Sequence, residues 1–441
     1  MGMSRRSFLK NFAIIGAATG FPTIVPSSVF GRNGMIPPSD RIGIGLISCG
    51  SRSGAAIAYK EYAKSEIVAV CDPRTDRRLK KKAEYGNCAD FNDFRDLLAM
   101  PEVDAVHIST ADHWHVPISL AAARAGKDMY TEKPLGKSIA QDLRAKEIVD
   151  KYNRIFQYGA QQRSMIQVRM GIELVLNGHI GDVQQIYVWC PGGAAGGARL
   201  PVLPVPEGFD YDLWLGPAPE MPFSHDRCLS DGGRTGIFHI YDYAIGFIAG
   251  WGAHPVDMMQ WWADNAGLQE IPELYKGHGE LAIGGLFDTL TRWDVTCTFR
   301  NGLKMRFMDG STANHLKPHP GVSGGHGTLF VGTKGWVKVM RGGWQVSDEP
   351  LYRLGNNPGE KRLKVSTNQL ENFVDCVISR EEPVDNLHSA VRSDIICHLS
   401  DICIREGRPI KWSNEKETIV DDLEAAKRMH VPLREPYTLD M

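Results

Sequence analysis

The chain has 441 residues, of which 43% are hydrophobic and 23% charged, a composition typical of soluble globular proteins and too long for one compact core. Lysine and arginine number 50 against 52 acidic residues, and this balance excludes the broad basic surface of a protein that binds nucleic acid or anionic membranes. The 9 cysteines have no CxxC spacing, so we expect neither a disulfide framework nor a metal site. The composition favours two domains that act on a small molecule.

Residues 1–35 are predicted to be an export signal. Residues 4–10, SRRSFLK, have the twin-arginine pattern, and an apolar run follows at residues 12–25. That run is shorter than the roughly 20 apolar residues of a membrane-spanning helix and contains glycine and proline, so we expect no stable membrane span. We predict a periplasmic or exported protein. Because this route carries folded proteins, we also expect a tightly held cofactor.

Residues 40–160 alternate short apolar runs with amphipathic stretches, which predicts strands followed by helices. Such alternation is typical of a parallel sheet with helices on both faces, the doubly wound α/β Rossmann architecture. Strands are expected at residues 42–47, 67–71, 105–109, 128–131 and 154–158, and helices at 55–64, 74–85, 91–100, 116–125 and 139–151.

Residues 161–441 lack the regular alternation of strand and helix patterns and contain longer strand-like segments. They predict a second domain of the α+β class, with a large, mostly antiparallel open sheet. The long loop at 191–236 is interpreted as a functional insertion. The C-terminal helices, one of them at 371–379, are expected to pack back on the first domain. The strand-like segments lie at 183–189, 293–299, 303–308, 328–331 and 337–340.

Residues 41–54, RIGIGLISCGSRSG, resemble a dinucleotide-binding turn. Such a turn holds a pyrophosphate with backbone N–H groups at the start of a helix and requires small residues. The GxGxxG pattern falls on Ser48, Gly50 and Ser53, so only the middle glycine is kept. We predict a working turn, in which the Ser48 and Ser53 hydroxyls are candidate phosphate donors.

Asp72 ends the second predicted strand, about 20 residues after Gly50, where an acidic side chain binds the adenosine ribose and favours NAD over NADP. Arg52 and Arg74 stand close by in the sequence and could hold a 2′-phosphate. NAD is therefore the predicted cofactor, with NADP as the alternative.

Two motifs follow the third and fourth predicted strands: residues 110–117, TADHWHVP, and residues 130–136, YTEKPLG. Both belong to the carboxyl edge of the sheet, where doubly wound folds bind ligands. With its Glu132-Lys133-Pro134 tripeptide, the sequence resembles the Gfo/Idh/MocA family of oxidoreductases and its exported bacterial branch. The resemblance extends over nearly the whole chain, through residues 161–164, 212–219, 251–257, 330–336 and 388–412.

The resemblance implies a dinucleotide held between a Rossmann domain and a sheet domain that receives a sugar or glycoside, in a homodimer or homotetramer formed through the second sheet. Lys133 would contact the nicotinamide ribose and the substrate hydroxyl, and His254 would exchange the hydroxyl proton, a role that suits histidine. The other implied cofactor contacts are Ser48, Gly50, Ser51, Arg52, Asp72, Thr110, Asp112, His115, Glu132 and Gln161, and the implied substrate contacts are Arg163, Tyr241, Asp257 and His326.

The sequence departs from the family before His254. Many members have an aspartate four residues earlier, where this chain has Gly250. Without that carboxylate we expect His254 to have a lower pKa or a different partner. The candidate partners near it in the sequence are Asp257, Tyr241, Asp242 and His239. The glycines around His326 predict either a flexible loop over the substrate cleft or a solvated turn.

Three functions fit these motifs. The first is an NAD(P)-dependent oxidoreductase that acts on a carbohydrate hydroxyl. The second is an enzyme that cleaves glycosides through transient oxidation by its bound NAD. The third is an inactive sugar-binding protein, against which the retained Asp72, Lys133 and His254 argue.

Overall fold

The computed structural model describes residues 37, 40–86, 88–197, 201–228, 236–268, 270–354 and 359–440. The predicted export signal lies outside these residues and stays a prediction. Among the helices of the described ranges, none combines the length and the apolar character that crossing a membrane requires.

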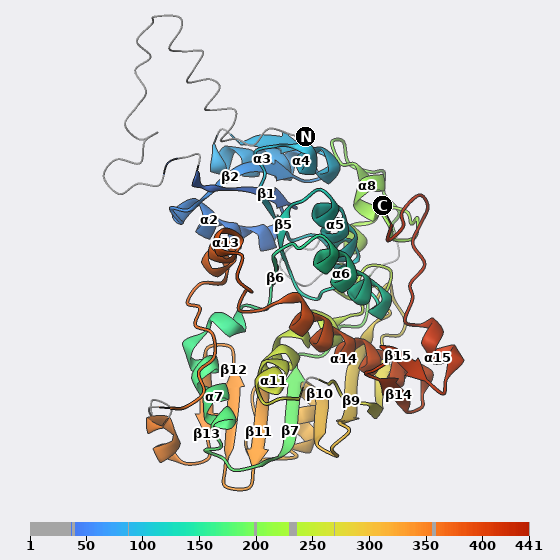
Figure 1. Ribbon diagram of the computed structural model, residues 1–441. Coiled ribbons are helices and arrows are strands. Elements are labelled where there is room, and N and C mark those ends of the chain that lie inside the picture. Colours follow the sequence, from blue (N-terminus) through green and yellow to red (C-terminus); the bar gives the residue numbers. More distant parts are fainter. Residues whose placement is uncertain are drawn as a thin grey trace, which may run out of the picture.

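The first domain contains a parallel sheet of six strands in the order β3-β2-β1-β4-β5-β6, which confirms the predicted Rossmann architecture (Figure 1). The chain order reverses between β1 and β4, and ligands of doubly wound folds bind at such a switch point. The strands are β1 (Ile42–Ile47), β2 (Ser65–Cys71), β3 (Ala89–Phe91), β4 (Ala105–Ile108), β5 (Asp128–Thr131) and β6 (Phe156–Tyr158).

Two helices of this domain begin earlier than predicted. The helical run after β1 starts at Ser51 as a 3-10 helix, η4 (Ser51–Ala56), and continues as α2 (Ile57–Glu61). Helix α5 (Asp112–Arg124) begins at Asp112. It contains Pro117, which has no backbone N–H and so removes one hydrogen bond of the helix. The remaining helices are α3 (Thr75–Tyr85), α4 (Phe94–Ala99) and α6 (Ile139–Lys151).

The second domain is built on a sheet of nine strands in the order β13-β12-β11-β7-β10-β9-β8-β14-β15. Its neighbours are antiparallel except β7 and β10, which agrees with the predicted mostly antiparallel sheet. The strands are β7 (Val183–Cys190), β8 (Leu274–Leu281), β9 (Leu290–Thr298), β10 (Lys304–Asp309), β11 (Gly327–Gly332), β12 (Trp336–Met340), β13 (Gly343–Val346), β14 (Ile410–Ser413) and β15 (Thr418–Val420).

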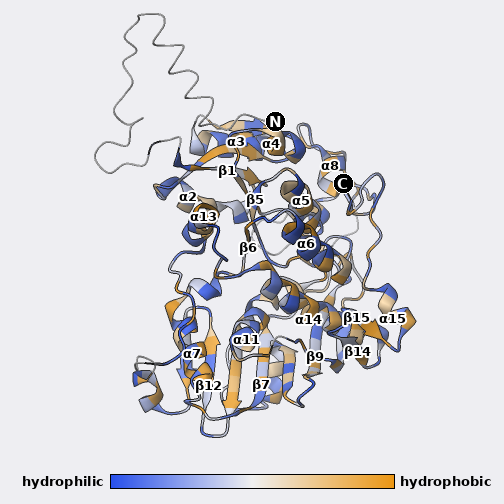
Figure 2. Ribbon diagram, viewed as in Figure 1, coloured by the Kyte–Doolittle hydropathy of each residue, from blue (hydrophilic) through white to orange (hydrophobic). Residues whose placement is uncertain are grey.

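Helices α7 (Ile166–Leu176), α11 (Ala253–Asn265) and α14 (Leu387–Glu406) cover one face of this sheet (Figure 1). Figure 2 shows hydrophobic colouring along β1, β11 and β12, as expected for strands that face helices. The largest hydrophobic cluster includes residues of both sheets, such as Val106 of β4 and Val295 of β9. The two domains therefore share one continuous core.

The C-terminal part of the chain returns to the first domain. Helix α13 (Gln369–Ser379) lies beside α2, where Asp375 accepts hydrogen bonds from Tyr62 and Lys64 (Figure 1). The ring of Tyr437 packs edge-on against Trp114 of α5 at 5.3 Å. The remaining helices are η5 (Gln161–Ser164), α8 (Tyr211–Leu215), α9 (His225–Cys228), η6 (Gly236–Phe238), α10 (Phe247–Gly250), α12 (Gly310–Leu316), η7 (Glu349–Arg353) and α15 (Leu423–Lys427).

Candidate functional site

The turn after β1 has the geometry of a phosphate-binding turn, with serine at a strained position. Ser48 has φ +84°, a conformation that glycine adopts easily and serine does not. A Cβ atom on Gly50 would meet no other residue closer than 3.6 Å, so the fold itself leaves room there for a ligand to approach. The first N–H groups of the run from Ser51 have no acceptor within their helix. The turn therefore fits a pyrophosphate.

The proposed role of the Ser53 hydroxyl is wrong. Ser53 is fully buried, and its Oγ donates to the carbonyl oxygen of Gly50 at 2.7 Å. The hydroxyl therefore closes the turn from inside instead of facing a phosphate. The Ser48 Oγ lies 3.4 Å from the Gly50 nitrogen and is also turned toward the turn itself.

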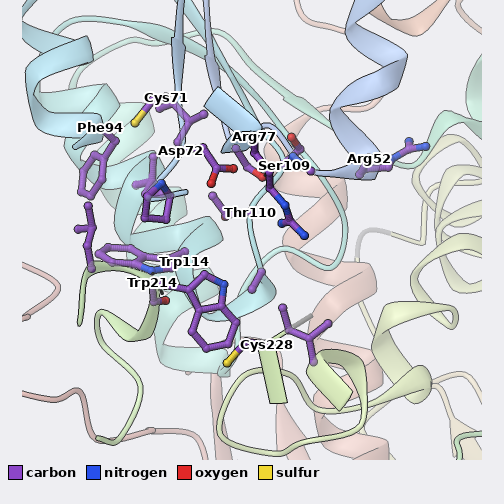
Figure 3. Close-up of a pocket in the computed structure, with 18 of the residues that line it drawn as sticks. Arg52, Cys71, Asp72, Arg77, Phe94, Ser109, Thr110, Trp114, Trp214 and Cys228 are labelled. Atoms are coloured by element: carbon purple, nitrogen blue, oxygen red, sulfur yellow. Dashed lines mark hydrogen bonds between the residues drawn. The ribbon is translucent and has the colours of Figure 1, made fainter. Parts of the chain in front are cut away.

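Asp72 joins the turn to β2 and faces the pocket. Its two carboxylate oxygens accept hydrogen bonds from the backbone nitrogens of Cys49 at 2.7 Å and Arg74 at 2.9 Å. Burial raises the pKa of Asp72, against the effect of these two bonds and of Arg77. Figure 3 shows the Asp72 carboxylate directed into the pocket, close to Arg77. Carboxylate oxygens keep further lone pairs for ribose hydroxyls, so the predicted contact is sterically and chemically compatible.

Arg52 and Arg77 line this pocket, and the predicted Arg74 does not. Arg74 pairs with Asp76 at 2.6 Å on the surface, and Arg52 pairs with Glu132 at 2.8 Å. Arg77 lies beside Asp72 and is a further candidate to hold a 2′-phosphate. The NADP alternative therefore has a candidate residue that the sequence did not indicate.

The pocket lies between the carboxyl edge of the first sheet and a segment of the predicted insertion. The empty space between its walls, with the open solvent at its mouth included, is about 970 Å³. We call residues 201–228 and 236–238 the strap. Figure 3 shows Trp114 of α5 and Trp214 of the strap side by side on one wall of the pocket. The other lining residues include Phe94, Ile118, Leu213, Cys228, Ile237 and Phe238.

Hydrogen bonds fix the strap to the strand ends. Gly208 accepts from the backbone nitrogen of Thr75 at 2.8 Å, and Asp210 donates from its own to Pro73 at 2.9 Å. The Trp114 indole donates to the carbonyl oxygen of Trp214 at 3.1 Å. These bonds hold the strap over the predicted adenosine side of the cofactor.

The loop that carries Lys133 belongs to the first domain and forms a hydrogen bond with the second. The Lys133 Nζ donates to the carbonyl oxygen of Gly250 at 2.5 Å, and burial lowers the pKa of Lys133. Beside it, Glu132 is buried and forms an ion pair with Arg52 at 2.8 Å. Arg52 and Glu132 therefore bind each other in this structure, at the edge of a cleft that both residues line with Lys133.

A buried acidic cluster supports the same loop from α14. The backbone nitrogens of Leu135 and Gly136 donate to Asp394 at 3.1 and 3.2 Å. His398 lies 3.4 Å from Asp142 and 3.6 Å from Asp394. Burial alone would lower the pKa of His398, but hydrogen bonds to both carboxylates outweigh it and raise the pKa to about 10. The protonated imidazole thus compensates the two carboxylates that position the loop.

Several residues that are predicted to contact the cofactor have buried polar atoms without a hydrogen-bond partner among the described residues. The Thr110 Oγ1, Asp112 Oδ2 and Gln161 Oε1 atoms are buried and have no hydrogen-bond partner among the described residues. Burial raises the pKa of Asp112 to about 6. Since buried polar groups are nearly always hydrogen-bonded, these atoms indicate that a polar ligand completes the site. One hydroxyl and two acceptor oxygens fit a dinucleotide, whose ribose hydroxyls and amide N–H groups donate hydrogen bonds.

His115 differs from these residues, because both of its ring nitrogens have a partner. Its Nδ1 lies 2.7 Å from the carbonyl oxygen of Pro134, and its Nε2 lies 3.1 Å from that of Thr110. Both ring nitrogens thus face the backbone of the ligand-binding edge. His115 lines the cleft together with Lys133, but its ring nitrogens lie against backbone carbonyl oxygens, so its contact with the cofactor stays a prediction.

His254 is the second residue of α11 and is buried, with 3% of its surface exposed. Its Nε2 lies 2.9 Å from the Nη2 of Arg341. Because a guanidinium only donates, Nε2 accepts and the imidazole proton resides on Nδ1, which has no partner among the described residues. Burial, then Lys133 and Arg341, lower the pKa of His254 well below 6.5. His254 is therefore a neutral imidazole.

Arg341 is the hydrogen-bond partner of the His254 Nε2 in the described structure. None of the four candidates named from the sequence bonds to His254 in the described structure. Asp257 pairs with Arg163, Tyr241 donates to Asp401 at 3.2 Å, Asp242 lies 3.6 Å from Arg227, and the His239 ring packs on Phe247 at 4.7 Å. The expectation of a different partner and a lowered pKa is confirmed, but the partner is a cation.

Two predicted substrate contacts have a structural role instead. The Arg163 Nε donates to Asp257 at 2.9 Å, and the side chains of the two residues are 2% and 0% exposed. Asp385 lies 3.3 Å from the same nitrogen. The charges of this cluster neutralise one another beneath α11. Their assignment to substrate binding was therefore wrong.

Tyr241 and His326 are also held by other residues. The guanidinium of Arg405 lies 3.7 Å from the centroid of the Tyr241 ring, so this ring is covered on one face. The His326 Nε2 accepts from the backbone nitrogen of Arg341 at 3.2 Å. His326 thus supports the turn that carries Arg341, and any contact it makes with substrate stays a prediction.

The sequence analysis missed Arg77, Trp114, Trp214 and Arg341. The tryptophans lie inside two of the quoted motifs, so their position in a ligand-binding edge was a usable signal. Arg341 stands in a polar turn between β12 and β13 and is 87 residues from His254 in the chain. No local pattern marks it.

The fold and pocket define a two-domain protein that binds a dinucleotide. A family model described as the oxidoreductase family with an NAD-binding Rossmann fold matches residues 42–160, and one for the C-terminal alpha/beta domain of the same family matches residues 170–335. Together the models span more than half of the chain. The chain belongs to the Gfo/Idh/MocA family of oxidoreductases, and its first domain is an NAD-binding Rossmann domain.

The chain is similar to a protein from Shewanella sp. (strain ANA-3) named glycosyl hydrolase family 109 protein 2. The two are 32% identical over 163 residues, which cover 32% of this chain and 35% of the relative. The chain matches its curated relatives over less than half of their own length.

Two solved structures share the fold. The WlbA dehydrogenase from Bordetella pertussis, in complex with NADH and UDP-GlcNAcA, has a TM-score of 0.60 at 16% identity, with 85% of this chain and 99% of that chain covered. The myo-inositol 2-dehydrogenase from Lactobacillus plantarum has a TM-score of 0.57 at 16% identity, with 84% and 99% covered. At this identity the likeness concerns the fold alone.

Proposed function

We propose that the protein is an NAD-dependent oxidoreductase that transfers hydride between a carbohydrate hydroxyl and a tightly bound nicotinamide cofactor. One observation carries this proposal: Lys133, which lines the cleft of the first domain, lies close enough to His254 of the second domain for its charge to act on that imidazole. Lys133 bonds to Gly250, next to Trp251, whose ring contacts His254, and the Lys133 charge lowers the pKa of His254. The bound nicotinamide would supply the hydride acceptor.

The two side chains suit the two halves of alcohol oxidation. His254 is neutral and can accept the hydroxyl proton at Nε2 once Arg341 moves away from that atom. Lys133 lies in the loop that Asp394 supports, and its Nζ donates to Gly250. Its charge can stabilise the negative charge that develops on the substrate oxygen. In the reverse direction His254 returns the proton to the oxygen.

A second function is favoured by the glycosyl hydrolase relatives. In this reading, transient oxidation of a sugar loosens a glycosidic bond, and the same bound cofactor then reduces the product. The strap supports both readings, because a fixed segment over the adenosine side favours a cofactor that stays bound through many turnovers. An inactive sugar-binding protein is the third reading.

The absorbance of the purified protein separates these functions. We expect the nicotinamide band of the bound cofactor to appear in its reduced form when an oxidisable sugar or glycoside is added. Release of free sugar without lasting reduction would favour glycoside cleavage. Failure to bind any dinucleotide would overturn both enzyme functions.

A further inference from the structure

Arg341 is a half-buried arginine with no carboxylate within ion-pair distance in the described part of the chain, and Glu132, which acts on it from farther away, is paired with Arg52. Its Nη2 contacts the neutral His254 at 2.9 Å, and its guanidinium carbon lies 5.0 Å from the centroid of the Trp251 ring. Its Nε is buried without a hydrogen-bond partner among the described residues. Burial lowers the pKa of Arg341. A guanidinium placed in this way is costly unless an anion joins it.

The surrounding charges do not supply that anion. Arg341, Arg52 and Lys133 are close enough to influence one another's pKa values. Glu132 is already paired with Arg52 at 2.8 Å, and the Asp112 carboxylate interacts with Lys133. The cleft therefore has more positive than negative charge beside His254.

We propose that the substrate is a sugar acid or a uronic-acid glycoside whose carboxylate binds Arg341. The proposal rests on the proposed function and names its substrate class. A carboxylate accepts two parallel N–H bonds from a guanidinium, including the unused Nε. A single guanidinium also matches the single charge of a carboxylate better than the double charge of a phosphate ester.

Binding of the carboxylate also prepares the base. When Arg341 turns its N–H groups to the carboxylate, the Nε2 lone pair of His254 becomes free. The hydroxyl proton then goes to Nε2 and the hydride leaves the same carbon for the nicotinamide, so that the C–OH becomes C=O and two electrons pass to the cofactor. Binding of an anionic substrate thus draws Arg341 away from the His254 Nε2, which it contacts when no substrate is bound.

Matched sugars test the recognition. We expect glucuronate to reduce the bound cofactor faster than glucose does, and calorimetry to show tighter binding of glucuronate, each by about 10- to 100-fold, the size of a charged hydrogen-bonded contact. In Arg341→Gln the preference for the acid should disappear. The matched control is Arg353→Gln, because Arg353 is an arginine with 81% of its side chain exposed, and there the preference should persist.

Substitution at Gly250 provides an independent test. A Cβ atom there meets nothing nearer than 3.8 Å, so a side chain can be introduced. Gly250→Asp places a resident carboxylate near the cations and should weaken glucuronate binding by about tenfold or more, whereas Gly250→Asn should not.

Equal binding of glucose and glucuronate, unchanged by Arg341→Gln, would overturn the substrate class while leaving an oxidoreductase that prefers neutral sugars. Stronger binding of glucose 6-phosphate than of glucuronate would overturn the carboxylate. If no sugar reduces the cofactor, the proposed function fails, and an Arg341-dependent glucuronate affinity would still support the recognition.

Discussion

Two of the arginines that contact helix α11 differ in the group to which each one bonds. Arg163 bonds to the carboxylate of Asp257, and Arg341 bonds to the neutral imidazole of His254. Each guanidinium lies near a tryptophan ring, at 5.6 Å from Trp261 and 5.0 Å from Trp251. The similar packing shows that burial against an aromatic ring does not distinguish the two. The counter-charge distinguishes them. Arg163 is paired with a buried carboxylate of the fold, whereas the Nε of Arg341 has no partner among the described residues and can bind a ligand.

The largest effect should come from breaking the Arg163 cluster. Arg163→Met leaves Asp257 and Asp385 buried without their cation, which should lower the free energy of unfolding by about 3–5 kcal/mol. Denaturant unfolding measures the loss. Arg341→Met should lower the same quantity by less than about 1 kcal/mol, because it removes no partner of a buried carboxylate. Similar losses in both variants would contradict the contrast between the two arginines.

Loss of a catalytic side chain should affect turnover without comparable loss of stability. Lys133→Met and His254→Gln should each slow cofactor reduction by about 10²- to 10⁴-fold, the range for a positioned acid or base. The measurement is single-turnover absorbance, with bound cofactor quantified in each variant. Wild-type rates in either variant would remove that residue from the mechanism.

The support of the Lys133 loop should have an intermediate effect and a pH signature. His398 has a pKa of about 10 in the fold, above the usual 6.5, so its contribution to stability is complete below pH 6.5 and is lost as pH rises through 10. Burial and Asp394 raise the pKa of Asp142 from 3.8 to about 7, so its contribution is lost earlier, as pH rises through 7, and the alkaline change belongs to His398. The Tm should therefore fall on the alkaline side.

Asp394→Asn should flatten this alkaline decline in Tm and slow cofactor reduction by about tenfold, because the Leu135 and Gly136 nitrogens lose a charged acceptor. Asp375→Asn, at an acidic residue on α13 remote from the loop, is the control. An unchanged pH profile in Asp394→Asn would show that the cluster does not titrate as described.

The smallest expected effect is a shift in the acid limb of kcat/KM. Because the pKa of His254 is well below 6.5, activity that needs its neutral form should persist below pH 6.5 in the wild type. Arg341→Gln removes a positive charge beside the ring, so the pKa should rise and the limb should move to higher pH. A limb that stays in place would show that Arg341 does not act on His254.

The sequence predicts the class of the first domain and five of the six strands of its sheet, but not the short β3, and it points to two residues of the candidate site. Regular alternation predicts the parallel sheet, and motifs at strand ends brought out Lys133. The family resemblance brought out His254. Arg163 and Asp257 were misassigned because charged residues beside a motif look the same in sequence whether they bind substrate or each other. Arg341 was missed because only tertiary folding brings a turn of the second sheet to α11.

The strap has a consequence for the redox balance of the protein. We propose that a dinucleotide beneath a segment that is hydrogen-bonded to Pro73, Thr75 and Trp114 exchanges slowly with a pool in solution. Each molecule would then have one hydride equivalent, and oxidation of one substrate would have to be followed by reduction of another in the same cleft. Such an enzyme rearranges or exchanges oxidation levels among its substrates and produces no soluble reducing equivalents.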